Sequence, residues 1–234
     1  MSEANKDLSP LTKDLGVSFK NEALLRQALV HRSYLNEHPD FDLDHNERLE
    51  FLGDAVLELS VTDHLFHNYD LPEGELTNLR AAIVRGEMLS NIAEEMELDD
   101  YLLLSKGERK DTGKARQYIL ANAVEAVIGA AYLDQGYDVA DALITKFVIS
   151  KLKKVVAEGS HIDNKSKFQE VAQEKFRLTP TYEVLQESGL DHDKQFTVGV
   201  FVGKEKMGEG QGTSKQEAQQ AAAREALEAV EDNS

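Results

Sequence analysis

The stretch HNERLEFLGDAVLEL, residues 45–59, carries four carboxylates at a spacing that puts them on one side of a helix. Glu47, Glu50, Asp54 and Glu58 are three, four and four residues apart, so at about 3.6 residues per turn they form one narrow stripe. Like charges at this spacing destabilise an isolated helix, and apolar residues flank the stripe. The pattern favours a bound positive charge, and a divalent cation held by oxygen atoms is the first candidate.

A solvated acidic face is the alternative, because the chain has 43 Asp and Glu against 26 Lys and Arg, for a net charge of −17. A second segment argues for the metal. YILANAVEAVIGAAYL, residues 118–133, contains one charged residue, Glu125, with Asn122 on the same helical face. Such a helix is predicted to be buried, and a buried carboxylate must be protonated, paired or bound to metal. Two helices that present oxygen ligands from apolar surfaces predict a carboxylate metal site.

Composition excludes several classes of protein. The chain has 234 residues, 41% of them hydrophobic, and no cysteine, which excludes disulfides and thiolate metal sites. It lacks an apolar run long enough to cross a membrane, and MSEANKDLSP at the N-terminus does not resemble a signal peptide. We therefore expect a soluble cytoplasmic protein without membrane contact. Its acidity argues against a nucleic-acid partner, unless bound cations and local basic patches offset it.

Two domains are expected. Residues 8–156 are predicted to form an all-α domain, with apolar residues at helical spacing over 21–30, 47–67, 75–85, 87–97, 117–134 and 138–155. A polar linker, AEGSHIDN, covers residues 156–163. Residues 163–231 are predicted to form a small α+β domain of order α-β-β-β-α, because a helix at 165–176 precedes alternating strand patterns and an Ala-rich helix at 214–230.

These motifs resemble bacterial ribonuclease III, the double-strand-specific endoribonuclease. The resemblance rests on HNERLEFLGDAVLEL, on LPEGELTNLRA at 71–81 and on YILANAVEAVIGAAYLDQG at 118–136. The segment 163–230, from DNKSKFQE to GTSKQEAQQAAAREAL, resembles a double-stranded-RNA-binding domain. The resemblance implies metal-dependent hydrolysis of double-stranded RNA to staggered ends with 5′-phosphate and 3′-hydroxyl groups, in ribosomal-RNA processing and messenger or small-RNA maturation and decay.

The resemblance also implies roles for individual residues. Glu50, Asn122 and Glu125 would ligate the metal, Mg²⁺ with Mn²⁺ as a substitute. Asp54 would position the attacking water or a second ion, which makes Asp54 and Glu125 the catalytic pair. Glu47 and Glu73 would lie at the rim of the cleft. Glu58 is outside the family's ligand set, so a solvated or paired side chain is expected there.

The family acts as a homodimer in which each of two centres cuts one strand. Gly53 lies among Phe51 and Leu52 inside the predicted helix, where glycine costs about 1 kcal/mol relative to alanine. A closely packed backbone would account for it. That backbone could belong to a second subunit or to the core of the same one, and the sequence leaves both open.

The RNA-binding domain would read A-form shape across two minor grooves, roughly 16 bp, rather than base sequence. By motif position, the residues facing the minor grooves would be Gln169, Glu170 and His192. Those meeting the phosphates between the grooves would be Ser214, Lys215 and Gln216, at a helix start whose free N–H groups favour an anion.

The sequence departs from the family pattern at three positions. Asn122 stands where Asp is usual, which removes one negative charge from the metal site and raises the alternative of a double-stranded-RNA-binding protein with weakened or lost cleavage. Gln216 replaces an expected Lys or Arg, and residues 163–230 carry nine basic against twelve acidic residues. Weak phosphate neutralisation predicts modest RNA affinity, although adaptation to a salty cytoplasm would also explain the acidity. Tyr118 stands where Ser is common, with no consequence evident from sequence.

Overall fold

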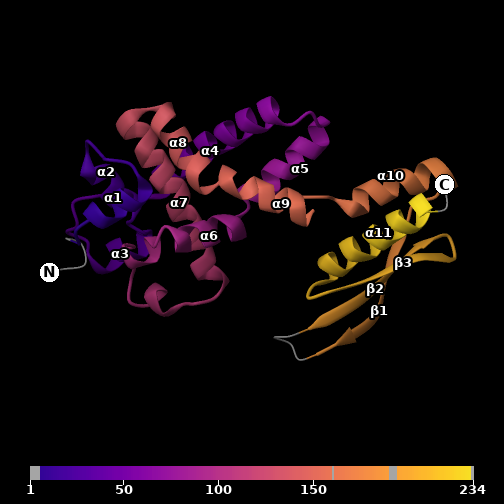
Figure 1. Cartoon of the computed structure of the whole chain (residues 1–234). Coiled ribbons are helices and arrows are strands. Elements are labelled where there is room, and N and C mark those ends of the chain that lie inside the picture. Colours follow the sequence, from indigo (N-terminus) through magenta and orange to yellow (C-terminus); the bar gives the residue numbers. More distant parts are fainter. Residues whose placement is uncertain (1–5, 160, 190–193, 233–234) are drawn as a thin grey trace. The chain divides into compact units, whose positions relative to one another are not determined.

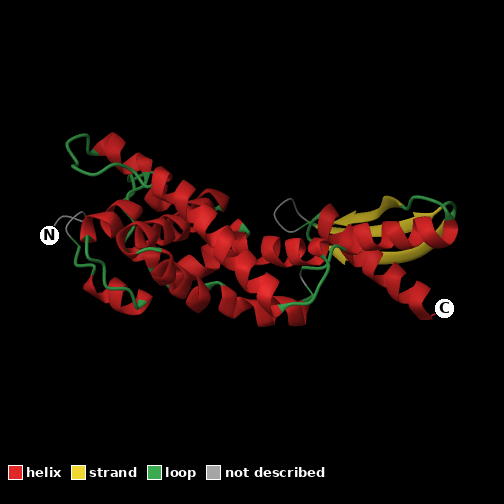
Figure 2. Cartoon of the chain, turned by 90° about the horizontal axis from the view of Figure 1, so that it is seen from above, coloured by secondary structure: helices red, strands yellow, loops and turns green. Residues whose placement is uncertain are grey.

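The computed structural model describes residues 6–159, 161–189 and 194–232, with side chains described as far as Val230 (Figure 1). It separates into two compact units, Met1–His161 and Ile162–Ser234. Strands occur only in the second unit, as the colouring of Figure 2 shows for the described chain. No helix in the described part is long and apolar enough to cross a membrane.

The first unit is built from α-helices joined by short 3-10 turns. Its α-helices are α1 (Ser9–Leu15), α2 (Glu22–Ala28), α3 (Arg32–Glu37), α4 (Glu47–Asn68), α5 (Glu73–Val84), α6 (Gly86–Glu95), α7 (Lys114–Gln135), α8 (Tyr137–Phe147) and α9 (Leu152–Glu158). The 3-10 turns are η2 (Leu98–Asp100), η3 (Glu108–Lys110) and η4 (Ile149–Lys151). The prediction of one helix over 138–155 was wrong. The helix breaks at Val148, where Val148 and Ile149 follow Phe147, and β-branched side chains of this kind lower helix propensity.

The core of this unit surrounds α7, as its apolar sequence predicts. Ala123, Val124, Ala126 and Val127 have no exposed surface. α4 crosses α7 at two glycines, and a Cβ atom added to Gly53 would come within 2.8 Å of the backbone nitrogen of Gly129. The close partner of Gly53 is therefore backbone of the same chain, which decides between the two explanations left open by the sequence.

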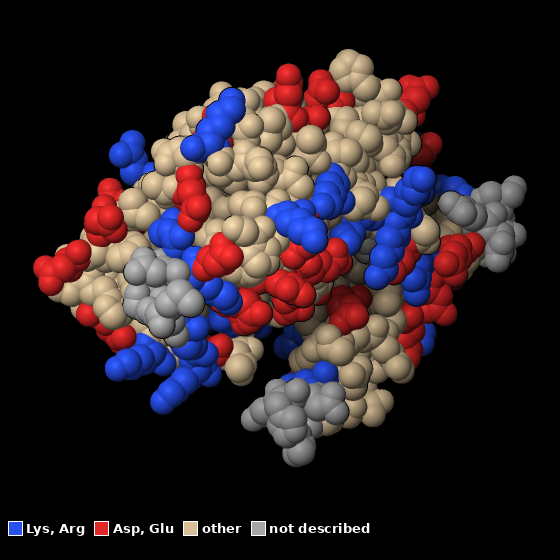
Figure 3. All heavy atoms as spheres, turned by 60° about the vertical axis from the view of Figure 1, so that its left-hand side comes forward, with Lys and Arg blue, Asp and Glu red and all other residues tan. Residues whose placement is uncertain are grey.

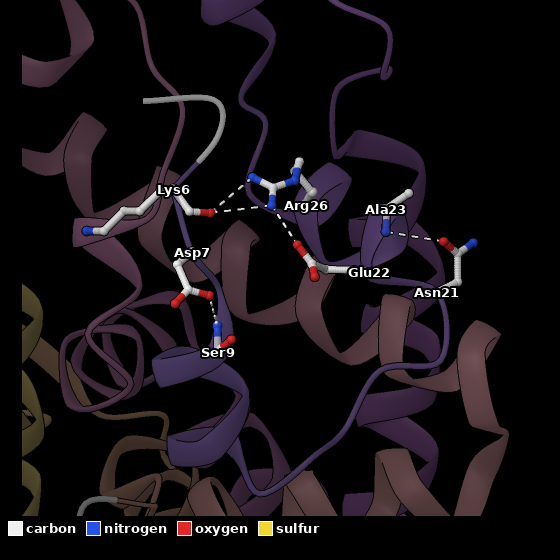
Figure 4. A network of polar contacts seen from close by, with 7 residues as sticks. All are labelled: Lys6, Asp7, Ser9, Asn21, Glu22, Ala23 and Arg26. Carbon is white, nitrogen blue, oxygen red and sulfur yellow. Dashed lines mark hydrogen bonds and ion pairs between the residues drawn. The ribbon is translucent and has the colours of Figure 1, made fainter. Parts of the chain in front are cut away.

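Polar contacts tie the start of the described chain to α2 (Figure 4). The Lys6 carbonyl accepts hydrogen bonds from both terminal nitrogens of Arg26, and Arg26 also pairs with Glu22 at 2.6 Å. The Asp7 carboxylate accepts from the backbone nitrogen of Ser9 at 2.9 Å. Residues 6 and 7 are thus ordered against the helical unit, and residues 1–5 lie outside the described chain.

The second unit is a three-stranded antiparallel sheet packed on two helices. Its elements are α10 (Asn164–Phe176), β1 (Thr181–Ser188), β2 (Gln195–Val202), β3 (Glu205–Gly212) and α11 (Lys215–Asp232), with strand order β1-β2-β3. Val198 and Val200 of β2 are fully buried, whereas the Gly-punctuated segment forms β3. A side chain at Gly208 or Gly210 would collide with the α11 backbone, so these glycines let α11 approach the sheet.

Candidate functional site

The candidate metal ligands lie where α4 crosses α7. Glu50 and Asp54 are one turn apart on α4, with Glu50 half-buried and Asp54 exposed. Asn122 and Glu125 are one turn apart on α7, and both are half-buried. The side chain of Asn122 hydrogen-bonds the Glu50 carboxylate, and Glu125 interacts electrostatically with both Asp54 and Glu50. The fold therefore brings together four side chains from positions about 70 residues apart in the sequence.

Burial and mutual repulsion make this an unfavourable place for negative charge. Burial, followed by the charges of Asp54 and Glu50, raises the pKa of Glu125 to about 7. Burial also raises the pKa of Glu50, with Glu47 and Asp54 adding to the shift and the Asn122 hydrogen bond opposing it. A half-buried acidic group without a cationic partner is typical of a functional site, and a divalent ion would relieve the repulsion.

The donor set suits a hard divalent cation, because carboxylate and amide oxygens are the ligands that Mg²⁺ and Ca²⁺ prefer. Within the described residues, however, no three acidic or histidine side chains converge into a ready-made metal cage. Repulsion among the carboxylates favours this open arrangement. Asn122 supplies the neutral oxygen of the set.

Glu47 lies one turn before Glu50 and contacts two basic side chains from outside α4. Its carboxylate is 3.3 Å from the Arg32 guanidinium and 3.7 Å from His45 Nδ1. Arg32 begins α3, and His45 precedes α4. Glu47 is thus a tethered acidic group at the edge of the cluster. The signature stretch by itself did not predict the pairing with Arg32.

Glu58 and Glu73 are not part of this cluster. Glu58 pairs with Arg80 of α5 at 3.1 Å, and Arg80 also donates to Thr62 Oγ1 at 2.9 Å. Glu73, the first residue of α5, lines a groove with the C-terminal half of α4. That groove begins at Thr62, roughly 12 Å along the helix axis from Asp54. Within one chain, Glu73 is therefore separate from the candidate metal ligands.

In the second unit, predicted RNA-contacting residues from two helices line one polar hollow of about 610 Å³. Gln169 enters it from α10, and Lys215 and Gln216 enter it from the start of α11. Glu170 is exposed on α10. The Ser214 hydroxyl accepts from the backbone nitrogen of Glu217 at 3.2 Å, so it caps α11. The prediction for His192 falls outside the described residues.

Comparison with known proteins agrees with both units. The model of the family described as "Ribonuclease-III-like" matches residues 21–152, and that of the "Double-stranded RNA binding motif" matches residues 164–230. Ribonuclease 3 of Oceanobacillus iheyensis is 46% identical over 226 residues, covering 96% of this chain and 98% of that protein. Ribonuclease 3 of Dehalococcoides mccartyi is 42% identical over 228 residues, covering 97% and 96%. This chain belongs to the ribonuclease III family.

A solved structure supports the same assignment for the helical unit. The nuclease domain of ribonuclease III from Campylobacter jejuni superposes with a TM-score of 0.56 and 38% identity, covering 62% of this chain and 97% of that one. The predicted family and the predicted order of an all-α domain before a small α+β domain are both confirmed. The chain is an endoribonuclease with a nuclease domain and a double-stranded-RNA-binding domain.

The RNA-binding domain of this ribonuclease III-family chain also contains polar residues that motif position did not identify. Lys165 Nζ donates to Gln219 Oε1 at 2.6 Å, and both residues line the same hollow as Gln169. Only the packing of α10 against α11 brings them together, and no local signal in either helix indicates the pair.

One face of the protein carries charges of both signs. On the face in Figure 3, Lys and Arg side chains are interspersed with Asp and Glu. In α11, Glu217 accepts from the backbone nitrogen and the hydroxyl of Thr213 at 2.8 and 2.7 Å, which adds negative charge beside the helix start. Glu217 of this ribonuclease III-family chain thus offsets part of the positive charge that Lys215 presents at the start of α11.

Proposed function

We propose that the chain hydrolyses double-stranded RNA at a metal centre formed by Glu50, Asn122 and Glu125. The proposal is carried by one observation, the half-buried Glu125, whose pKa of about 7 reflects burial and two neighbouring carboxylates. A bound divalent ion supplies an activated water and a countercharge for the anionic transition state. We propose Mg²⁺ as that ion, with Mn²⁺ as a substitute, because every donor is an oxygen.

The chain's own residues would divide the remaining work. Asp54 is exposed, so its carboxylate can reach a water beside the RNA and orient it toward the phosphorus. Asn122 hydrogen-bonds Glu50, which favours the charged form of that carboxylate. Glu47, held by Arg32, would support the cluster from its edge. Glu73 would act at the rim, away from the ligands.

We propose that two copies of the chain form the working enzyme. Phe51, one residue after Glu50, is 81% exposed, the largest exposed fraction among the large hydrophobic side chains of the described chain. Burial of a phenylalanine contributes about 1.5–3 kcal/mol, which favours a second subunit as its cover. A Phe51→Asp variant is expected to be monomeric in light scattering, whereas Phe66→Asp on the same helix is expected to leave the oligomeric state unchanged.

Each subunit of such a dimer would cut one strand and leave staggered ends with 5′-phosphate and 3′-hydroxyl groups. The RNA-binding domain would contact A-form minor grooves through Gln169, Glu170 and His192, and the phosphates through Ser214, Lys215 and Gln216. We propose precursors of ribosomal RNA and structured messenger or small RNA as substrates, and the cytoplasm as the place where the enzyme meets them.

Incubation of the purified chain with Mg²⁺ and a long RNA duplex tests the proposal. Short duplex products are expected, with none from single-stranded RNA. Glu125→Gln should lower kcat by at least about a thousandfold, because it removes a metal ligand from the cluster. The matched control is Glu94→Gln, at an exposed position of α6. Tight binding of the duplex without any products would instead establish the alternative function, an RNA-binding protein disabled by Asn122.

A further inference from the structure

Tyr118 is the most exposed aromatic side chain on α7, the helix at the centre of the nuclease core. Its exposed fraction is 66%, whereas the other six tyrosines of the chain are buried or half-buried. Exposure of an aromatic ring to water is unfavourable. Tyrosine is common at binding interfaces, because its ring is apolar and its hydroxyl group is polar. The location of Tyr118 on α7 indicates what kind of molecule it would contact.

Tyr118 shares a helical face with the candidate metal ligands. Asn122 and Glu125 follow it by four and seven residues, the spacing that keeps side chains on one side of a helix. Between Ile119 and Tyr132, the other α7 residues are buried, so this face is the open one in the middle of the helix. Tyr118 is one turn, roughly 6 Å, along the axis from Asn122. An RNA strand bound at Glu125 would therefore lie near Tyr118.

The chemistry of this face favours a neutral hydrogen-bond donor. A Lys or Arg at position 118 would be drawn to Glu50 and Glu125, and it would compete with a metal ion for them. A phenol donates a hydrogen bond without that competition. Lys114, an exposed residue one turn earlier on the same face, is far enough from the ligands to meet a phosphate. Along this face of α7, Lys114 comes first, Tyr118 follows one turn later, and the candidate metal ligands come next.

We propose that the Tyr118 hydroxyl donates a hydrogen bond to the ribose–phosphate backbone of the RNA strand, at a nucleotide adjacent to the cleaved bond, while the ring packs on that ribose. The sugar edge is the target because A-form RNA displays its 2′-hydroxyl groups in the shallow minor groove. This inference rests on the proposed metal centre, and it adds a substrate-binding residue that fixes the position of the strand. Tyr118 contributes no metal ligand.

Steady-state cleavage by Tyr118→Phe and Tyr118→Ala at saturating Mg²⁺ tests the proposal. Tyr118→Phe should raise KM about 3–10-fold, the change expected for one neutral hydrogen bond, and Tyr118→Ala should raise it further. The affinity for duplex RNA with Ca²⁺ in place of Mg²⁺ should fall in parallel, while the Mg²⁺ concentration needed for half-maximal rate stays constant. Leu133→Ala, at an exposed position near the far end of α7, is the matched control.

Substrates with a single 2′-deoxynucleotide locate the contact. In the parent, one deoxy position beside the cleaved bond should raise KM about 3–10-fold, and in Tyr118→Phe the same substitution should have no further effect. Equal KM values for parent and Tyr118→Ala would overturn the proposal, as would a loss of dimer in Tyr118→Ala. Failure of the metal centre itself would be distinguished by a Glu125→Gln variant that still cuts.

Discussion

The backbone of Gly53 on α4 lies directly against the carbonyl group of Glu125 on α7. A Cβ atom at position 53 would overlap that carbonyl and come within 2.8 Å of the backbone nitrogen of Gly129. The residue that lets the two helices touch therefore lies against the backbone of Glu125, whose side chain is the half-buried carboxylate of the candidate metal centre. Packing and chemistry are coupled at this crossing, because moving α7 away from α4 would also move Glu125 away from Glu50.

We expect Gly53→Ala to destabilise the nuclease domain and to lower its activity. Alanine has the better helix propensity by about 1 kcal/mol, but its Cβ would meet backbone rather than a flexible side chain, and overpacking of this kind costs about 1–3 kcal/mol or more. Gly74→Ala is the matched control, since a Cβ at Gly74 meets nothing within 4 Å. Urea unfolding should show a lower midpoint for Gly53→Ala and an equal or higher one for Gly74→Ala. Equal stability of Gly53→Ala and the parent would contradict the close crossing.

The raised pKa of Glu125 predicts how stability depends on pH without metal. An acid whose pKa rises on folding binds more protons folded than unfolded, so its contribution is fully present below about pH 4.5 and is lost as the pH rises through about 7. In EDTA, Glu125→Gln should remove this loss. After allowance for partial exposure, the variant should be about 1–2 kcal/mol more stable than the parent at pH 8 and no more stable at pH 4.5.

Denaturant unfolding at several pH values measures this difference, and Glu94→Gln should follow the parent throughout. Added Mg²⁺ should make the parent more stable than Glu125→Gln at pH 8. An ion that binds the folded state stabilises it, and only the parent keeps all of the proposed metal-binding side chains. The idea fails if Glu125→Gln and the parent lose stability equally between pH 4.5 and 8 in EDTA.

Asn122→Asp should improve metal binding and weaken the metal-free protein. The new carboxylate adds a negative charge to the ligand set but removes the amide that hydrogen-bonds Glu50, so repulsion within the cluster increases. We expect a Mg²⁺ requirement for half-maximal cleavage about tenfold lower, together with a lower unfolding midpoint in EDTA. A variant with an unchanged Mg²⁺ requirement would show that Asn122 is not a ligand. Asn91→Asp, at an exposed position of α6, is the control.

Lys215 should account for one phosphate contact of the RNA-binding domain. Removal of one such contact reduces the slope of log affinity against log salt by about 0.7–0.9, so Lys215→Ala should show this reduction in duplex binding measured with Ca²⁺. Lys204→Ala is the control, because Lys204 is exposed in the turn between β2 and β3, away from the polar hollow. An unchanged slope for Lys215→Ala would remove this residue from the interface.

Gln216→Lys should do the opposite and raise affinity. Gln216 lines the same polar hollow as Lys215, at a position where the resemblance to double-stranded-RNA-binding domains leads us to expect a cation. We expect the salt slope to steepen by about one unit and affinity at low salt to rise several-fold. A matched Gln211→Lys change, at an exposed position of β3, should have no such effect. Identical slopes for parent and Gln216→Lys would mean that this helix start does not meet phosphate.

The sequence alone determined the family, the domain order and the helices that carry the carboxylates. This was possible because helical periodicity is local. The stripe of Glu47, Glu50 and Asp54 needs only the 3.6-residue repeat to become one face, and the apolar surroundings of Glu125 need only composition to predict burial. The same local reasoning failed at Val148, where a run of bulky side chains ends a helix that periodicity would continue.

Only the tertiary structure decided which groups meet. Gly53 accommodates the α7 backbone of its own chain, Glu58 pairs with Arg80, and Glu47 is held by Arg32. The tertiary structure also leaves Tyr118 exposed, one helical turn before Asn122. Each of these pairings depends on how two helices cross, and the crossing is set by side-chain volumes over the whole interface rather than by any one stretch. The sequence thus predicted the candidate ligands, and packing determined their neighbours.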